Sequence, residues 1–212
     1  MTPSPALAPG IPELGLLERA VAYAGVALTA VPSASPGSQT SCAAWNLTEL
    51  LVHMHDSLGA LEQAGRFGQG DLTVPTRHPY PVHPLPDPVQ ALKDRACGLL
   101  GAWTAANGDR LVSIAGSPLQ AGVLAAAGAL EVAVHGWDVA QACRLDHPVP
   151  QALAEDLLAY LPLLVQPADR PDRFGPALPA PADIASDVRL LAAVGRRVPG
   201  DLPKNAASGP AN

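Results

Sequence analysis

The sequence predicts an all-α fold in which four long helices form a bundle and shorter helices follow at the C-terminal end. Hydrophobic residues make up 48% of the 212 residues but aromatic residues only 4%, so Ala, Leu and Val must build the core. Ala and Leu favour helices, whereas strands are enriched in aromatic and β-branched residues. Apolar residues also recur at helical spacing, and no segment alternates strongly enough between apolar and polar residues to indicate a sheet.

The first two helices are predicted from apolar periodicity and, for the second, from a capping signal. A helix is expected from about Pro12 to Ala30, where apolar residues recur every three to four positions. The second helix should begin after Asn46, because Glu49 lies three residues later and completes the pattern of a capping box. Its apolar stripe continues to about Gly65.

Two residue pairs that end in proline predict the start of the next two helices. Asp87-Pro88 has the residue types of an N-cap and a first helical position, and this helix should extend to about residue 106. Ser117-Pro118 predicts the start of a fourth, almost uncharged helix that extends to about residue 143. Four long helices with connections of varied length favour an antiparallel four-helix bundle.

The rest of the chain divides into two shorter helices and Pro-rich connections. A fifth helix is expected from Pro150 through Leu164 and a sixth around Ser186–Val194. Residues 67–86 form a long connection rich in Gly, Pro and His, of a length typical of functional or mobile loops. We therefore divide the chain into a flexible N-terminus (residues 1–11), a helical bundle (residues 12–197) and a disordered tail (residues 198–212).

Charge and cysteine usage exclude several classes of protein. The net charge of -6 and the absence of a Lys/Arg cluster argue against nucleic acid and anionic membranes as partners. No apolar run is expected to reach the length of a membrane span, and no basic segment precedes an apolar one as in a signal peptide. Cys42, Cys97 and Cys143 are widely spaced, as is typical of reduced thiols. We expect a cytoplasmic bacterial protein, monomeric or homodimeric.

One face of the fourth predicted helix combines carboxylates with an imidazole. Glu131, His135 and Asp138 are spaced i, i+4, i+7, which places them on one helix face in an apolar setting. A buried carboxylate beside an imidazole is costly unless it is compensated, and a divalent ion such as Zn²⁺ accepts both groups as ligands. His53, in the second helix, offers a further imidazole. From the residues alone, a hydrogen-bonded core histidine and a Glu–His pair at a helix surface stay open as alternatives.

The other histidines and the arginines have less specific settings. His55 is rotated by about 200° from His53 around the helix axis, so both cannot face one ion. Three further histidines fall in Pro-rich turns and are expected to be solvated: His78, His83 and His147. His78 and His83 would line the mouth of the site if the 67–86 loop covers it. Three arginines are candidates for holding a substrate carboxylate, with surface ion pairing favoured instead: Arg77, Arg189 and Arg196.

Three separate motifs carry a resemblance to a known family. The segment from Trp45 to His53, preceded by Ser41-Cys42, resembles the W-x(4)-L-x-x-H pattern of the DinB-like metal-binding bundles. The segment Glu131-Val-Ala-Val-His135-Gly-Trp-Asp138-Val-Ala is similar to the E-x-x-x-H-G-W-D-x-A signature of the branch around mycothiol-dependent maleylpyruvate isomerase. Phe174-Gly-Pro and the segment 189–196 resemble the C-terminal end of that branch. The resemblance covers most of residues 12–197.

The resemblance implies a catalytic metal centre with three protein ligands. It makes His53, Glu131 and His135 the ligands, with water or substrate in the open position. Zn²⁺ is the favoured ion, with Ni²⁺ and Fe²⁺ as alternatives, and mycothiol is the implied cosubstrate. We expect Asp138 to be the catalytic residue, either orienting His135 or acting as a base, with a carboxylate at the helix surface as the alternative.

Three more residues of the family motifs are expected to be structural. Trp45 and Trp137 should wall the core, and Cys42 should be a small buried residue rather than a ligand.

The function that the resemblance implies is activation of a low-molecular-weight thiol for addition to an electrophilic small molecule. Addition alone would conjugate the thiol, and addition followed by rotation and expulsion would isomerise a double bond. The maleylpyruvate isomerase has a further C-terminal domain, for which we expect no room after residue 197. Two other hypotheses use the same ligands: a thiol-independent metal-dependent lyase, cyclase or hydrolase, and a metal-binding protein without catalysis.

Overall fold

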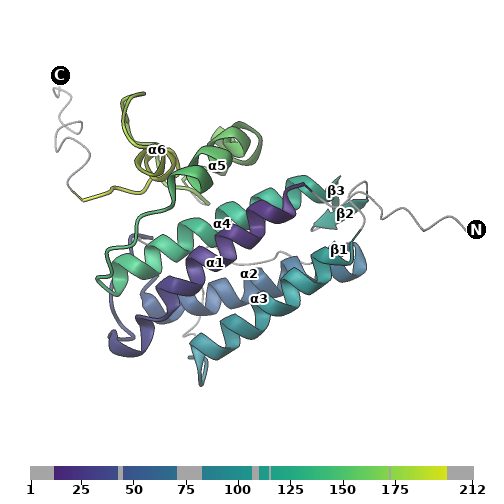
Figure 1. Ribbon diagram of the computed structural model, residues 1–212, viewed down its shortest axis with the longest axis horizontal. Helices are drawn as coiled ribbons and strands as arrows, with labels where there is room; N and C mark the ends of the chain where they lie inside the picture. The colour runs from purple at the N-terminus through teal and green to yellow at the C-terminus, as the bar shows by residue number, and fades with distance from the viewer. Residues whose placement is uncertain are drawn as a thin grey trace, which may run out of the picture.

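Four long helices form the body of the protein in a computed structural model, and two shorter helices pack to one side (Figure 1). The structure describes residues 12–42, 45–70, 83–106, 110–114, 116–171 and 173–199. The prediction of an all-α bundle with extra C-terminal helices is confirmed. The expected flexible N-terminus, nearly all of the expected tail and most of the 67–86 connection lie outside the described residues, and the proposed domain limits stay a prediction. The bundle helices are α1 (Leu14–Leu28), α2 (Leu47–Phe67), α3 (Pro88–Thr104) and α4 (Ala121–Ala142).

The capping signals of α2 and α3 act as the sequence predicts. The side chain of Asn46 accepts a hydrogen bond from the backbone N–H of Glu49, and the Glu49 carboxylate accepts one from the Asn46 N–H. Asp87 caps α3, ahead of Pro88, by accepting a hydrogen bond from the backbone N–H of Gln90. Helix α2 continues slightly beyond its expected end and stops at Gly68, whose φ of 75° is the left-handed conformation that glycine adopts most readily.

A small sheet at one end of the bundle corrects the expectation that the chain has no strands. It contains β1 (Gln69–Gly70), β2 (Leu111–Ile114) and β3 (Ser117–Gln120), with β1 parallel to β2 and β2 antiparallel to β3. Ser117 and Pro118 therefore belong to a hairpin strand, and α4 begins only at Ala121. Strands of two to four residues are too short to show alternation, and their pairing depends on contacts that are distant in sequence.

The two C-terminal helices lie against the α1/α4 side of the bundle (Figure 1). Helix α5 (Gln151–Leu164) contacts both α1 and α4, and α6 (Ser186–Ala193) packs on α5. Both helices begin near the expected residues. A short 3₁₀ turn, η2 (Pro167–Asp169), follows α5, and another, η1 (Val31–Ser33), follows α1.

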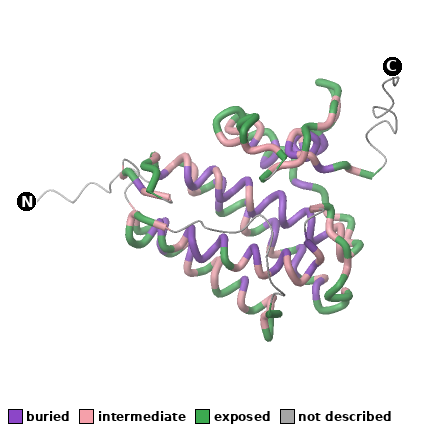
Figure 2. Tube along the Cα trace, turned by 180° about the vertical axis from the view of Figure 1, so that it is seen from behind, coloured by how far each residue is buried: buried purple, intermediate pink, exposed green. Residues whose placement is uncertain are grey.

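Helix α4 is the central helix of the core, and most of its residues are buried. Buried residues are drawn purple in Figure 2. Helix α4 packs closely on α1, where a Cβ atom on Gly136 would lie only 2.9 Å from the Cβ of Ala24. By length and composition, α4 and the segment Leu14–Ser33 are each apolar enough to span a membrane, which corrects the expectation that no run reaches that length. For α4, 83% of that apolar window is buried inside the protein, as in the core helix of a bundle.

Candidate metal centre

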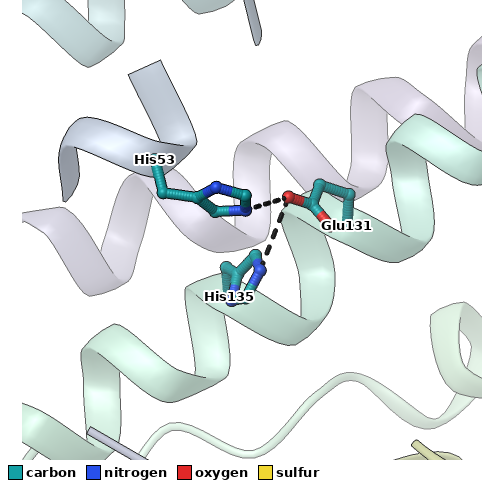
Figure 3. Close-up of side chains that lie close together, drawn as sticks. All are labelled: His53, Glu131 and His135. Atoms are coloured by element: carbon teal, nitrogen blue, oxygen red, sulfur yellow. Dashed lines mark hydrogen bonds and ion pairs between the residues drawn. The ribbon is translucent and has the colours of Figure 1, made fainter. Parts of the chain in front are cut away.

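Three side chains from two helices direct ligand atoms to one point inside the bundle (Figure 3). Helix α2 supplies His53, and α4 supplies Glu131 and His135 one turn apart. Nε2 of His53 lies 2.8 Å from Oε1 of Glu131, and Nε2 of His135 lies 3.4 Å from the same oxygen. The three candidate ligand atoms all lie within 4.8 Å of one another. This group could hold a metal ion.

The imidazole of His53 is positioned by stacking on an aromatic ring and by a polar contact of one of its two nitrogens. Its ring stacks on the indole of Trp45, with the ring centres 4.0 Å apart. Its Nδ1 is buried and has no hydrogen-bond partner among the residues that the structure describes. Nε2, in contrast, points to Glu131. Stacking therefore fixes the plane of the ring and leaves Nε2 as the nitrogen directed into the cluster.

Glu131 is the most accessible member of the cluster. Its side chain is 32% exposed, whereas those of His53 and His135 are 9% and 7% exposed. Its Oε1 also accepts a hydrogen bond from the hydroxyl of Ser57 at 3.1 Å. Burial opposes ionisation of Glu131, but the nearby imidazoles and the hydrogen bonds outweigh it and hold its pKa well below the ordinary value. The group is thus a carboxylate at neutral pH, and solvent reaches the cluster on its side.

Asp138 lies behind His135 and orients its ring. Its Oδ2 is 3.0 Å from Nδ1 of His135 and 2.9 Å from Nη2 of Arg196, and its side chain is completely buried. Burial opposes ionisation of Asp138, but the hydrogen bond with His135 and the charge of Arg196 outweigh it and lower its pKa. An ionised carboxylate can only accept, so Nδ1–H of His135 donates to Asp138, and this contact turns Nε2 of the ring toward Glu131.

The donor set suits a divalent ion of the zinc type. Two imidazole nitrogens and one carboxylate oxygen are ligands that Zn²⁺ takes in catalytic centres with an open position. A carboxylate behind a ligating histidine is also a common arrangement around such ions, because it fixes the ring and its tautomer. The residues present therefore fit the ion that the motifs imply.

Comparison with known proteins identifies the family. The model of the family described as mycothiol maleylpyruvate isomerase N-terminal domain matches residues 17–140. The chain belongs to this family. The match contains α1 to α4 almost entirely and includes all three residues of the cluster. No curated protein and no solved structure matches the chain.

The other histidines that the structure describes lie outside the cluster, in three different settings. His55 points away from the cluster and contacts Asp56 and Arg95. His83 is exposed, and His78 lies outside the described residues. The expectation that His147 is solvated was wrong, because its half-buried ring stacks on Tyr23 with the ring centres 4.4 Å apart.

Arg196 is the functional candidate whose setting differs most from the expectation. Surface ion pairing was favoured for it, yet the residue is only 6% exposed and binds the buried Asp138. Asp138 itself is no surface carboxylate. The sequence contains no signal for this pair, since 58 residues separate its members. Arg189 is exposed, and Arg77 lies outside the described residues.

The structural residues of the motifs lie in or beside the core. Trp45 and Trp137 are 7% and 2% exposed and belong to the main core cluster. Cys42 is partly buried and packs against that cluster, and none of the three cysteines forms a disulfide.

Proposed function

We propose that the protein is a metal-dependent enzyme that activates a low-molecular-weight thiol, such as mycothiol, for addition to an electrophilic small molecule. The observation that carries this proposal is the convergence of His53, Glu131 and His135 within 4.8 Å, in a chain of a mycothiol-related family. A divalent ion held by these three residues would lower the pKa of a thiol in its open position and so supply a thiolate at neutral pH.

The chain's own residues would prepare the site in four ways. Trp45 holds the ring plane of His53, and Ser57 donates a hydrogen bond to the Glu131 oxygen that both imidazoles face. The partial exposure of Glu131 gives a small molecule access from that side. The buried walls around the histidines exclude water from the rest of the cluster, which strengthens the interaction of charged groups there.

Asp138 fits the role of orienting His135 better than that of a base that touches substrate. It is completely buried, and its two oxygens bind His135 and Arg196. A general base has to reach the proton that it removes, directly or through one water. We therefore assign Asp138 to holding His135 in the tautomer and direction that a ligand needs.

The test is a Co²⁺-loaded protein titrated with mycothiol. We expect an intense near-ultraviolet sulfur-to-metal charge-transfer band, which should disappear in Glu131→Gln and His135→Ala. The matched control replaces Cys42, Cys97 and Cys143 together by Ser and should keep the band. A band lost in that control would mean that the sulfur belongs to the protein.

The absence of the band at saturating mycothiol, with Co²⁺ bound, would overturn thiol activation. It would favour the thiol-independent lyase, cyclase or hydrolase, because the same ligands can activate water or polarise a carbonyl. A Co²⁺-bound protein that is inert to mycothiol and to electrophiles alike would favour a metal-binding protein without catalysis.

A further inference from the structure

The chain beyond the family match presents one arginine to the interior of the bundle. The match ends at residue 140, whereas Arg196 follows α6 near the end of the described chain. Gly195 has a φ of 81°, and a Cβ atom there would lie 2.7 Å from the backbone of Gly175. Only glycine fits both constraints without displacing the backbone. The sharp turn at this position directs the next residue back toward α4.

Further hydrogen bonds fix the end of α6 in this position. The backbone N–H of Arg196 donates to the carbonyl oxygen of Leu191 at 2.7 Å. The guanidinium of Arg170 donates to the carbonyl oxygens of both Ala193 and Gly175. The backbone that carries Arg196 is thus tied to the preceding loop and to α6 before its side chain enters the bundle.

The side chain of Arg196 binds Asp138 through the edge of the guanidinium that carries Nε and Nη2. Nε lies 3.1 Å from Oδ1 and Nη2 lies 2.9 Å from Oδ2, which is the two-point geometry that Arg forms with carboxylates. The two side chains are 7% and 0% exposed. Because Oδ2 also faces Nδ1 of His135, a continuous path of polar contacts runs from the C-terminal segment to the metal cluster.

We propose that Arg196 is a positioning residue of the metal centre, which it reaches through Asp138 and His135. The proposal rests on the proposed metal-dependent function. Arg196 compensates the buried charge of Asp138 and fixes the plane of that carboxylate. Without it, Asp138 would be a buried carboxylate with one remaining partner, a costly state that it relieves by turning toward other groups. That movement would release the ring of His135 from the direction that a ligand needs.

The experiment measures Co²⁺ affinity by competition with a chelator, together with the visible absorption spectrum of the bound ion, in the full chain. Arg196→Met should weaken Co²⁺ binding about tenfold, the lower end of the range for outer-shell partners, because Arg196 acts through another residue. It should also change the spectrum, since the spectrum reports ligand geometry. The control is Arg189→Met, which removes an exposed arginine from the same segment and should leave both readouts unchanged.

A double-variant cycle tests whether the effect passes through Asp138. In the Asp138→Asn background, which already lacks the carboxylate, Arg196→Met should cause little further loss of affinity. An equal loss in both backgrounds would overturn the proposed path. A well-folded Arg196→Met protein with the affinity and spectrum of the wild type would overturn the proposal itself.

A second variant decides the case if Arg196→Met does not fold. Arg196→Lys keeps the charge but cannot form the two-point contact. We expect an altered spectrum with an affinity between those of the wild type and Asp138→Asn. An unchanged spectrum would overturn the positioning role. A wild-type protein that binds no Co²⁺ would overturn the proposed function. A wild-type protein that binds Co²⁺ with an affinity and spectrum that do not change in the Arg196 variants would overturn only the positioning role.

Discussion

Nε2 of His53 lies 2.8 Å from Oε1 of Glu131, although 78 residues separate the two side chains and they belong to different helices. The contact joins α2 to α4 at the point where, among the residues that the structure describes, His and Glu ligand atoms from both helices come together. Because α4 carries His135 one turn after Glu131, the contact also brings the second imidazole to the same carboxylate oxygen. The account of this protein depends on whether that point holds a metal ion.

Substitution of any cluster residue should greatly weaken metal binding, whereas substitution of the neighbouring His55 should leave metal binding unchanged. His53→Ala, Glu131→Ala and His135→Ala should each lower metal affinity by more than the roughly 10- to 100-fold that loss of an outer-shell partner costs. His55→Ala should bind as the wild type does, because His55 faces Asp56 and Arg95 instead. Isothermal titration of the metal-free proteins with Zn²⁺ measures this. Loss of binding in His55→Ala with retention in His53→Ala would reverse the assignment.

The stability of the metal-free protein should fall in acid, in part because of Glu131. Its pKa in the folded protein lies below the ordinary value of 4.5, so the unfolded chain takes up its proton at a higher pH than the folded protein does. This contribution is present above the ordinary value and is lost as the pH falls from there toward the lowered value. Urea unfolding of wild type and Glu131→Gln between about pH 6 and pH 3 should show a shallower dependence in the variant. Equal dependences would contradict the depressed pKa.

The packing of α1 on α4 should be sensitive to one added methyl group. Gly136→Ala places a Cβ atom 2.9 Å from the Cβ of Ala24, so the helices must move apart, at a cost of about 1–3 kcal/mol in the free energy of unfolding. Gly25→Ala is the matched control, because a Cβ atom there has no neighbour within 4 Å. It should stabilise by about 0.5–1 kcal/mol through helix propensity alone. Thermal or urea unfolding compares the two, and stabilisation by both substitutions would show that the helices pack less closely.

The sequence predicted the elements whose signals are local. The capping pair Asn46 and Glu49 and the Asp87 cap each mark a helix start within a few residues, and the structure agrees with all of them. Ser117-Pro118, like Asp87-Pro88, combines a residue that often caps helices with a following proline, but it pairs with β2 instead. Nothing within that dipeptide shows whether it starts a helix or joins a strand, because the result depends on pairing with β2.

The candidate site shows the same division between local and distant signals. The spacing of Glu131, His135 and Asp138 is a property of one helix, so their common face could be predicted from the sequence. The approach of His53 was implied only by the family resemblance. The burial of Arg196 against Asp138 depends on the path of the chain after α5, for which neither periodicity nor a local motif gives a signal.

The most direct test of the account is the metal content of the purified protein, measured by elemental analysis after reconstitution with Zn²⁺ and removal of excess ion. The account predicts about one Zn²⁺ per chain in the wild type and almost none in Glu131→Ala. Wild-type protein that retains no stoichiometric transition metal, while its circular dichroism shows an intact helical fold, would contradict it.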